Sequence, residues 1–341
     1  MKKFIKVVFV ISTILFLIGC KEFVYELNSD KTGYILKEYK GSSEHLTIPD
    51  SYKGLPITEI GDSALLKIRY TTHFTGDLII PENIIKIGDF AFTRTGFTNL
   101  VLSKNLKTIG KEAFSECKNL KNITFHDGIE EIKKGAFSGC SGLTGNLNIP
   151  KSLTKIEEET FRDTGYTGLI IPNSIKIIGE SALGGARLTG HIIIPDNVIE
   201  IGDGAFRGIR AEKITITKNI KRIGNWTFAR NDQLLEVVIP EGVTEIGDDA
   251  FSLCRFLRSV TIPSTITSIG KFALGEHCNG LTKIVCNAPN PPVIDDTTFY
   301  MVGFLSGNSI KVSIIVPKDS VIAYQKTPVW RKYKDIITFR G

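Results

Sequence analysis

The chain contains 341 residues, of which 42% are hydrophobic and 23% are charged. This balance is typical of folded proteins and excludes a largely disordered chain. The formal net charge is +6, and removal of residues 1–19, which hold three lysines and no acidic residue, would lower it to +3. That charge is too small to indicate a nucleic-acid partner, because nucleic-acid binding needs a clustered basic face.

The amino terminus has the layout of an export signal. Met1–Lys3 is basic and Phe4–Ile18 is mostly apolar, which is the order of charge and apolar stretch in a secretory signal. The string Leu17-Ile18-Gly19-Cys20 that follows resembles the lipobox of bacterial lipoproteins, in which the cysteine is acylated and the chain is cut before it. The resemblance implies a signal peptide over 1–19 and a lipidated Cys20. A plain signal peptide with a chance cysteine and a single-span anchor remain as alternatives.

A lipid anchor also implies a location. Stable anchoring takes two or more acyl chains, which lipidation of Cys20 would supply. The pair Lys21-Glu22 resembles the charged surface-export tag of some lipoproteins of the Bacteroidetes. We therefore expect an exported bacterial lipoprotein that is anchored in the outer membrane and exposed at the cell surface.

The rest of the chain is a repeat with an average period of about 23 residues. An isoleucine, usually followed by glycine, recurs at 60, 87, 109, 132, 156, 178, 201, 223, 246 and 269, with a degenerate copy at 294. Ala-Phe or a close variant begins four residues after each of these isoleucines, as in Ala91-Phe92 and Ala136-Phe137. This slot accounts for many of the 20 phenylalanines.

A short apolar-x-apolar string that often ends in proline precedes each isoleucine, as in Leu78-Ile79-Ile80-Pro81. Such strings predict very short strands. We expect the Ile-Gly pair to form a turn, and an aspartate beside it to cap a one-turn helix that seats Ala-Phe; these aspartates are Asp62, Asp89, Asp203 and Asp248. One such unit cannot bury its own apolar face, so stacked units are required.

The predicted fold is therefore a repeat solenoid of leucine-rich-repeat type with about 11 repeats and end caps. The pattern L-x-x-I-x-I-P-x-x-V-x-x-I-G-x-x-A-F-x-x-C over residues 40–340 resembles the BspA-like leucine-rich repeat family. The resemblance implies a bacterial surface protein that acts as an adhesin and binds host proteins.

The predicted organisation has four parts. Residues 1–19 form the signal peptide, 20–39 the lipidated start of an N-terminal cap, 40–300 the solenoid and 301–341 a C-terminal cap. Asp319–Lys326 is expected to form a short helix in the last part, with Trp330 and Tyr333 covering the final turn. Terminal repeats need such covers because they would otherwise expose core and a free strand edge.

Three cysteines occupy one repeat position. Cys117, Cys140 and Cys254 each follow the repeated phenylalanine by three residues, where other repeats carry Thr, Ala or Ile. This predicts a small buried side chain. Cys117 and Cys140 fall in neighbouring coils, close enough for a disulfide that an exported protein permits, although parallel side chains make it awkward.

Catalytic and metal-binding patterns are absent from the sequence. One metal site was considered, from Cys254, His277, Cys278 and Cys286, but its spacing is unlike paired zinc-ligand motifs. The five histidines are scattered over different repeats, and paired carboxylates fall in predicted turns. We therefore expect no enzyme activity and no cofactor.

The middle residue of each predicted strand faces away from the core and forms a ladder of candidate binding residues. Its members are Ile79, Val101, Thr124, Asn148, Ile170, Ile193, Thr215, Val238 and Thr261, with Thr47 and Val285 at the ends. The ladder is mostly β-branched, which sheet propensity alone also explains. Alternatively it is an exposed apolar strip that contacts a protein.

These observations predict a non-enzymatic surface lipoprotein for adhesion or protein binding, with a host or neighbouring-cell surface or matrix protein as partner. One alternative is a glycan-binding accessory lipoprotein, because Phe90, Trp226 and Phe272 precede the alanine slot and offer rings for sugar stacking. Another is an envelope scaffold without a soluble ligand. The membrane is contacted through the lipid, and no nucleic acid is expected.

Overall fold

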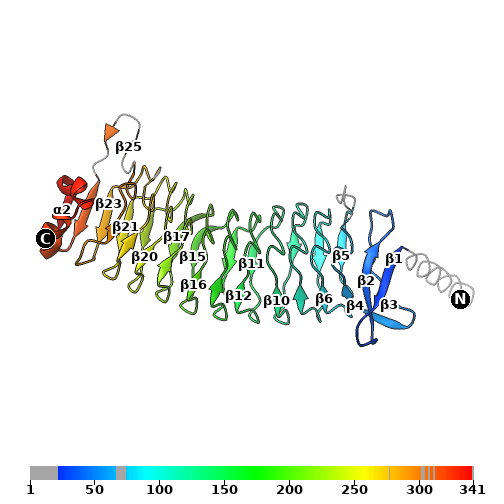
Figure 1. The fold of residues 1–341 in the computed structure, drawn as a ribbon. Helices are drawn as coiled ribbons and strands as arrows, with labels where there is room; N and C mark the ends of the chain where they lie inside the picture. Colours follow the sequence, from blue (N-terminus) through cyan, green and yellow to red (C-terminus); the bar gives the residue numbers. More distant parts are fainter. Residues whose placement is uncertain are drawn as a thin grey trace, which may run out of the picture. The chain divides into compact units, whose positions relative to one another are not determined.

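The computed structural model describes residues 22–66, 74–275, 277–300, 304–305, 308–309 and 312–339. The chain divides into two compact units, Met1–Thr144 (unit 1) and Gly145–Gly341 (unit 2). Each unit is a β-solenoid of stacked coils (Figure 1). The predicted signal peptide and Cys20 lie outside the described residues.

The elements of unit 1 are all strands. They are β1 (Phe23–Leu27), β2 (Tyr34–Tyr39), β3 (Ser51–Tyr52), β4 (Leu55–Ile60), β5 (Asp77–Ile79), β6 (Lys86–Ile87), β7 (Asn99–Val101), β8 (Thr108–Ile109), β9 (Asn122–Ile123) and β10 (Glu131–Ile132).

Unit 2 has strands and, near its end, short helices. The strands that belong to its coils are β11 (Asn146–Asn148), β12 (Lys155–Ile156), β13 (Gly168–Ile170), β14 (Ile177–Ile178), β15 (Thr189–Ile193), β16 (Glu200–Ile201), β17 (Arg210–Thr215), β18 (Arg222–Ile223), β19 (Glu236–Val238), β20 (Glu245–Ile246), β21 (Ser259–Ile262), β22 (Ser268–Ile269), β23 (Lys283–Cys286) and β24 (Val293–Ile294). The remaining elements are β25 (Phe304–Leu305), β26 (Asn308–Ser309), β27 (Ser313–Val316), η2 (Lys318–Ser320), α2 (Val321–Lys326), η3 (Trp330–Ile336) and β28 (Ile337–Phe339).

A coil contributes a first strand, which carries the apolar-x-apolar string, and a second strand that ends at the repeated isoleucine. Equivalent strands pair in parallel and in register, so that Ile87 of β6 lies opposite Ile109 of β8. Eleven second strands of the described residues end at the predicted isoleucines, which confirms the repeat register. The predicted Ile-Gly turn is wrong by one residue. The isoleucine belongs to a strand, where its branched side chain packs into the core, and the turn begins at the glycine.

The Ala-Phe segment is not the helical turn that the sequence predicts. The residue before the Ala-Phe position is left-handed in the ten coils from Ser63 to Phe272, for example with φ of 56° at Ser63, 58° at Phe90 and 57° at Trp226. A left-handed residue interrupts a right-handed helical turn. Backbone N–H groups here bond to the next coil instead, as from Phe92 to the Ala113 carbonyl at 2.8 Å.

The aspartates after Ile-Gly do not cap helices either. The carboxylate of Asp62 accepts a hydrogen bond from the backbone N–H of Asp89, and Asp89 accepts one from Lys111, both at 2.8 Å. The glycine allows this close stacking, because a Cβ on Gly88 would lie 2.6 Å from the backbone nitrogen of Asp62. Each aspartate therefore joins its coil to the following one.

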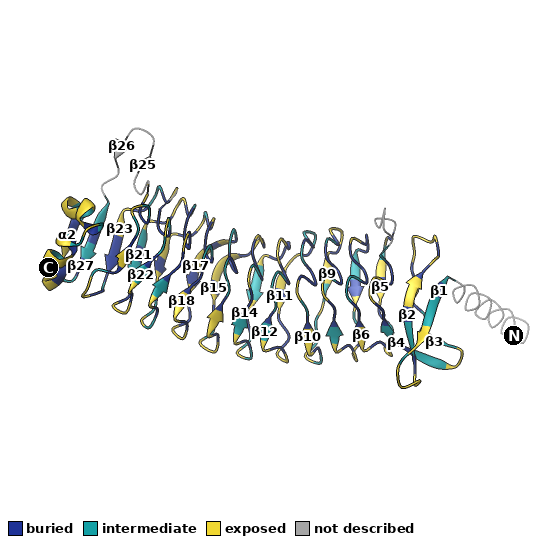
Figure 2. Cartoon of the chain, viewed as in Figure 1, coloured by how far each residue is buried: buried dark blue, intermediate teal, exposed yellow. Residues whose placement is uncertain are grey.

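Phenylalanine rings form the centre of the core. Phe92, Phe114 and Phe137 are at most 2% exposed. Ring centroids are 5.1 Å apart between Phe92 and Phe114, and 5.4 Å apart between Phe114 and Phe137. Phe206, Phe228 and Phe251 form a second such stack in unit 2. Buried and exposed residues alternate along the coils (Figure 2), so the predicted core is confirmed at this slot.

The first coil of unit 1 is covered by antiparallel additions. β1 pairs antiparallel with β2, and β3 with β4, whereas β2 runs parallel to β4. Three half-buried tyrosines gather there: the rings of Tyr25 and Tyr52 stack at 4.1 Å, and Tyr34 meets Tyr52 edge-on at 5.0 Å. Aromatic packing at this end shields the strand edge that a solenoid would otherwise expose.

The last coil of unit 2 is covered by strands and helices. β27 and β28 extend the first-strand sheet beyond β23. The short helix expected over Asp319–Lys326 is present as η2 and α2. Trp330 is buried and donates a hydrogen bond to the Pro292 carbonyl at 2.8 Å, and both Trp330 and Tyr333 contact the ring of Phe299. The predicted cover of the final turn is confirmed.

Among the described residues, no helix has the length and apolar character needed to cross a membrane.

Candidate functional site

The candidate binding ladder lies on the outer side of the first strands. The side chains of Ile79, Val101, Ile170, Ile193 and Val238 are between 52% and 66% exposed, whereas the flanking strand residues that face inward are mostly buried. Thr47, Thr124, Asn148 and Thr215 are also exposed, and Thr261 is half-buried. The outward direction predicted for these residues is therefore correct.

Val285, the last predicted member, is an exception. It is only 4% exposed, and its strand β23 is paired on both sides, with β21 and β27. The expectation that Val285 faces solvent is therefore wrong. Pairing on both sides does not by itself bury an outward side chain, since Val101 in the doubly paired β7 is 52% exposed. The ladder of unit 2 therefore ends near Thr261.

The ladder is not one continuous sheet. In unit 2 the first strands form three separate blocks, with interruptions between β13 and β15 and between β17 and β19. Both interruptions fall where the segment from the isoleucine to the next strand lengthens by one residue. Ile214 follows Ile201 by 13 residues, whereas Val237 follows Ile223 by 14. The same lengthening occurs between β7 and β9, because Leu100 follows Ile87 by 13 residues and Ile123 follows Ile109 by 14, yet these strands pair. The change in length therefore does not by itself predict an interruption.

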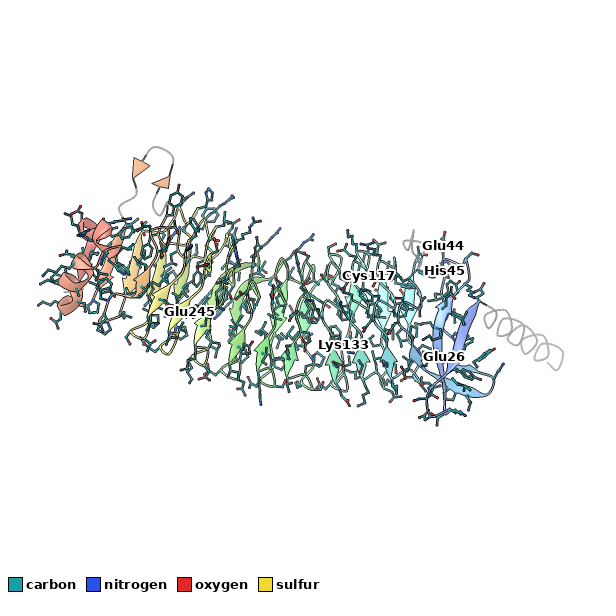
Figure 3. All side chains as sticks on the ribbon, viewed as in Figure 1. Glu26, Glu44, His45, Cys117, Lys133 and Glu245 are labelled. Atoms are coloured by element: carbon teal, nitrogen blue, oxygen red, sulfur yellow. The ribbon has the colours of Figure 1, made fainter. Side chains whose placement is uncertain are left out.

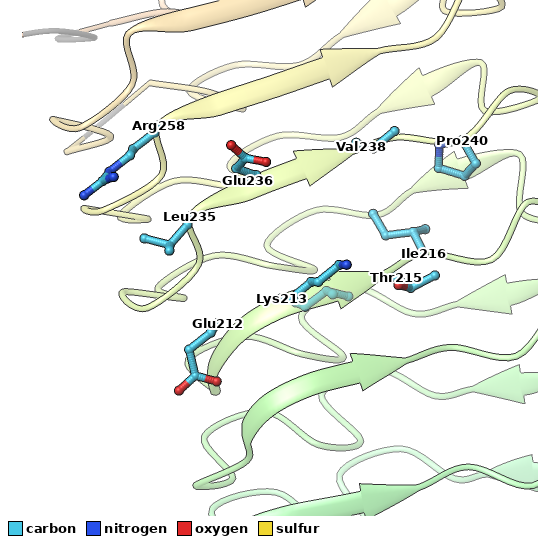
Figure 4. Close-up of a pocket in the computed structure, with 10 residues that line it drawn as sticks. Glu212, Lys213, Thr215, Ile216, Leu235, Glu236, Val238, Pro240 and Arg258 are labelled. Atoms are coloured by element: carbon cyan, nitrogen blue, oxygen red, sulfur yellow. The ribbon is translucent and has the colours of Figure 1, made fainter.

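An open groove of about 660 Å³ lies at the second interruption, between β17 and β19 (Figure 4). Its apolar lining includes Leu235 and Val238, which are 41% and 66% exposed. Lys213, Glu236 and Arg258 add charged groups of both signs. The groove was not expected from the sequence, which treats successive strands as equivalent.

The three rings considered for sugar stacking do not form a shared platform. Phe90 lies in unit 1, whereas Trp226 and Phe272 lie in unit 2 and are separated by the coil that carries Asp249. Each ring already has a neighbour: the Arg207 guanidinium lies 4.9 Å from the centre of the Trp226 ring. Rings in alternate coils with occupied neighbours give no continuous stacking surface.

The cysteines that follow the repeated phenylalanine are buried and donate hydrogen bonds. Cys117, labelled in Figure 3, donates from Sγ to the Phe92 carbonyl of the preceding coil at 3.1 Å. Cys140 donates in the same way to the Phe114 carbonyl at 3.0 Å. Both thiols are free, so no disulfide joins them. Asn231 fills the same position in another coil and donates to the Phe206 carbonyl at 3.0 Å, whereas the buried Ala186 and Ile209, which fill it elsewhere, have no side-chain donor.

The buried thiols of Cys140, Cys254 and Cys278 have environments that suppress reactivity. Burial raises the pKa of Cys278 to about 12 and raises the pKa values of Cys140 and Cys254 well above the ordinary value. Thiols at neutral pH in such sites stay protonated, and the thiolate is the nucleophile and metal ligand. Cys286 contacts the Tyr324 hydroxyl at 3.2 Å. Within the described ranges, no three His, Cys, Asp or Glu side chains lie together as a metal site.

Comparisons with known proteins agree with the repeat. The family model described as BspA type leucine rich repeat region matches residues 58–189 and 187–306, in six copies. The pneumococcal vaccine antigen PcpA has a similar fold, with 14% identity, coverage of 93% of this chain and 95% of that chain, and a TM-score of 0.51.

Two further solved structures are more weakly similar in fold. A leucine rich cell surface protein from Faecalibacterium prausnitzii A2-165 is 24% identical, with 78% of this chain and 93% of that chain covered and a TM-score of 0.44. A leucine-rich repeat protein from Bacteroides ovatus ATCC 8483 is 20% identical, with 77% and 93% covered and a TM-score of 0.36. No curated protein matches the chain. The family model spans well over half of the sequence, and the chain belongs to the BspA-type leucine-rich repeat family.

Proposed function

We propose that this protein is a non-enzymatic adhesion protein that binds a host or neighbouring-cell surface or matrix protein through the exposed ladder of its first strands. The observation that carries the proposal is the exposure of large β-branched side chains at Ile170, Ile193 and Val238. Exposed apolar side chains gathered on one face tend to mark protein contacts. BspA-type repeat proteins are typically bacterial cell-surface proteins, and leucine-rich repeats are generally not enzymes.

The fold supports a broad contact rather than a pocket for chemistry. Paired first strands hold ladder residues opposite each other, as Asn148 is to Ile170 and Ile193 is to Thr215. Such strands are rigid, so little conformational entropy is lost when a partner binds. A macromolecular partner fits a strip of this kind better than a small molecule.

Lipidation at Cys20 would tether the array to a membrane and present many copies at one surface. Single sites with Kd of about 1 μM would then act together, because linked sites raise the effective concentration of each other. Anchoring in the outer membrane with the array exposed outside the cell is part of the same proposal.

The proposal is tested with the lipid-free protein, residues 22–341, against extracellular-matrix proteins and intact host cells. Asp substitution at both Ile170 and Ile193 places two charges in the contact face and should weaken binding at least tenfold, or about 1.4 kcal/mol. Both side chains are exposed, so the coil should remain folded. Unchanged binding by the double variant would move the contact off this face.

Ile199 provides a matched control. Its side chain is 58% exposed, as is that of Ile193, but it lies before the second strand β16. Ile199→Asp should leave binding within about twofold of the parent protein, a difference of about 0.4 kcal/mol. Equal losses in the control and the double variant would indicate a general charge effect.

Two other functions remain as outcomes of further tests. Glycan binding that is lost in Trp226→Ala would favour a glycan-binding accessory lipoprotein. Recovery of a single envelope protein from intact cells, without any binding to host material, would favour a scaffold. Adhesion that persists after deletion of residues 40–340 would end the adhesin proposal.

A further inference from the structure

One edge of unit 2, between the Ala-Phe segment and the first strand, carries a cluster of arginines. They lie 6 to 12 residues after the repeated isoleucine in four consecutive coils: Arg187, Arg207, Arg210, Arg230, Arg255 and Arg258. We call this set the arginine edge. Arg187, Arg210 and Arg255 each lie nine residues after their isoleucine, and equivalent residues of stacked coils lie on the same side of a solenoid at about 4.8 Å per coil. The other three arginines lie within three residues of that position.

Most of the positive charge on the arginine edge has no partner in the described part of the chain. Arg255 alone makes an ion pair, with Asp232 at the long distance of 3.9 Å. By contrast Arg222, on the second strands, pairs with both Asp203 at 3.2 Å and Glu245 at 2.9 Å. Arg162 is also paired, whereas five of the six arginines of the edge have no ion pair in the described part of the chain.

All members of the arginine edge except Arg207 are exposed. Arg207 is half-buried and lies over the Trp226 ring, which holds the guanidinium in a fixed orientation. Burial lowers the pKa of Arg207, and the like charges of Arg230 and Arg162 lower it further. The site therefore contains guanidinium groups that repel each other, and a bound anion would reduce this repulsion.

Two apolar features adjoin the arginines. Phe256, between Arg255 and Arg258 in sequence, is 57% exposed although it is aromatic. The groove between β17 and β19 has Arg258 and Lys213 in its lining next to Leu235, together with the carboxylates of Glu212 and Glu236 (Figure 4). Anionic groups of a ligand would bind the guanidiniums here, while the apolar face of one of its rings packs on Phe256 or Leu235.

We propose that the arginine edge binds an anionic polysaccharide, with sulfate groups as the main contacts. Guanidinium groups bind oxyanions through paired N–H donors, which gives both energy and orientation. A repeated row of cations across four coils matches a polymer that repeats its charge, and sugar rings supply the apolar faces for Phe256. BspA-type proteins are typically cell-surface proteins, and sulfated polysaccharides are polyanions found outside cells. The arginines themselves are not ladder residues, although the groove that Arg258 lines also holds the ladder residues Thr215 and Val238.

The test measures binding of residues 22–341 to heparin at physiological ionic strength, about 0.15 M. The triple variant Arg187→Gln, Arg210→Gln, Arg230→Gln should lose at least tenfold in affinity and show a shallower dependence on salt. These three side chains are exposed and unpaired in the described structure, so their replacement should not unfold the coils. Chemically desulfated heparin should bind much more weakly than heparin to the parent protein.

The matched control removes the same charge from another place in unit 2. Lys176→Gln, Lys218→Gln, Lys221→Gln changes three exposed lysines in the loops before the second strands and should retain heparin binding within about twofold. Equal losses in the two triple variants would overturn the proposal, because net charge alone would then explain the binding.

Two further outcomes distinguish this site from a general polyanion site and from polysaccharide binding at the ladder. Single-stranded DNA that binds as tightly as heparin would overturn the polysaccharide assignment in favour of a general polyanion. The Ile170→Asp, Ile193→Asp variant should bind heparin as the parent protein does, whether or not it has lost its protein partner. Loss of heparin binding in that variant would place the polysaccharide on the ladder and refute the separate site.

Discussion

Replacement of Phe137 by alanine tests how strongly the stacked rings hold neighbouring coils of unit 1. Phe137 is 0% exposed, and its ring lies 5.4 Å from Phe114 and 5.3 Å, edge-on, from Phe125. Burial of a phenylalanine side chain contributes about 1.5–3 kcal/mol. Each aromatic pair adds about 0.5–1.5 kcal/mol. The cavity left by alanine brings the expected loss of stability to about 3–5 kcal/mol.

Two further variants separate the contribution of the aromatic ring from that of any large apolar side chain and from that of an exposed residue in the same unit. Phe137→Leu keeps a large apolar side chain that the repeat itself accepts at Leu65 and Leu183, and it should cost less than about 2 kcal/mol. Thr124→Ala lies on the exposed ladder of the same unit and should stay within about 1 kcal/mol.

The readout must report on unit 1. Both tryptophans, Trp226 and Trp330, lie in unit 2, so their fluorescence follows the other half of the chain. Hydrogen exchange measured by mass spectrometry resolves local opening. The amides of the unit 1 coils that carry Phe114 and Phe137 should lose protection in Phe137→Ala and keep it in Thr124→Ala. Equal changes in these two variants would show that the assigned register of core and ladder is wrong.

Two other predictions concern cysteines. Cys20→Ala should block lipid transfer and leave unprocessed or soluble protein in place of a detergent-partitioning form, and mass spectrometry that finds an unmodified amino terminus elsewhere would exclude the lipobox assignment. Cys278, whose pKa burial raises from 9.0 to about 12, should resist iodoacetamide at pH 8 until urea is added. Between pH 9 and 12 the native state keeps a proton that the unfolded state has lost, so the free energy of unfolding should fall as pH rises through this window. If a Cys278→Ser variant loses the same stability at alkaline pH, other groups cause the loss.

The repeat register could be predicted because one residue type fills one slot in successive coils. Phe92 and Phe137 recur at a fixed offset from an isoleucine, and only burial between coils explains that regularity. The outward direction of Ile79 follows from alternation along a strand. The role of Trp330 in covering the last coil could be predicted because this residue follows the last repeat.

Other features depend on contacts between coils, which a single repeat does not encode. Asp89 looks like a helix cap because aspartate caps helices in most sequences, yet its partner is a backbone N–H 22 residues away. The arginine edge was missed because its arginines differ in their offset from the isoleucine, which is nine residues for Arg187 and Arg210 but seven for Arg230. Only the stacking of the coils brings these arginines to one side of unit 2, and only the ion pairs of the structure show which arginines lack an acidic partner.

The bonding of each coil to the next one also sets how the array would respond to force. Within unit 1, the strand pairs, the backbone bonds beside Phe92 and the carboxylate bond of Asp62 all run from one coil to its neighbour. Tension applied at the amino terminus along the stacking direction would load these bonds one coil at a time rather than all together. Coils would then peel away in order, starting with the cap formed by β1 and β2. If the protein acts as the proposed adhesin, a cell attached through it under flow would be held by a chain that lengthens in small steps before the contact itself breaks.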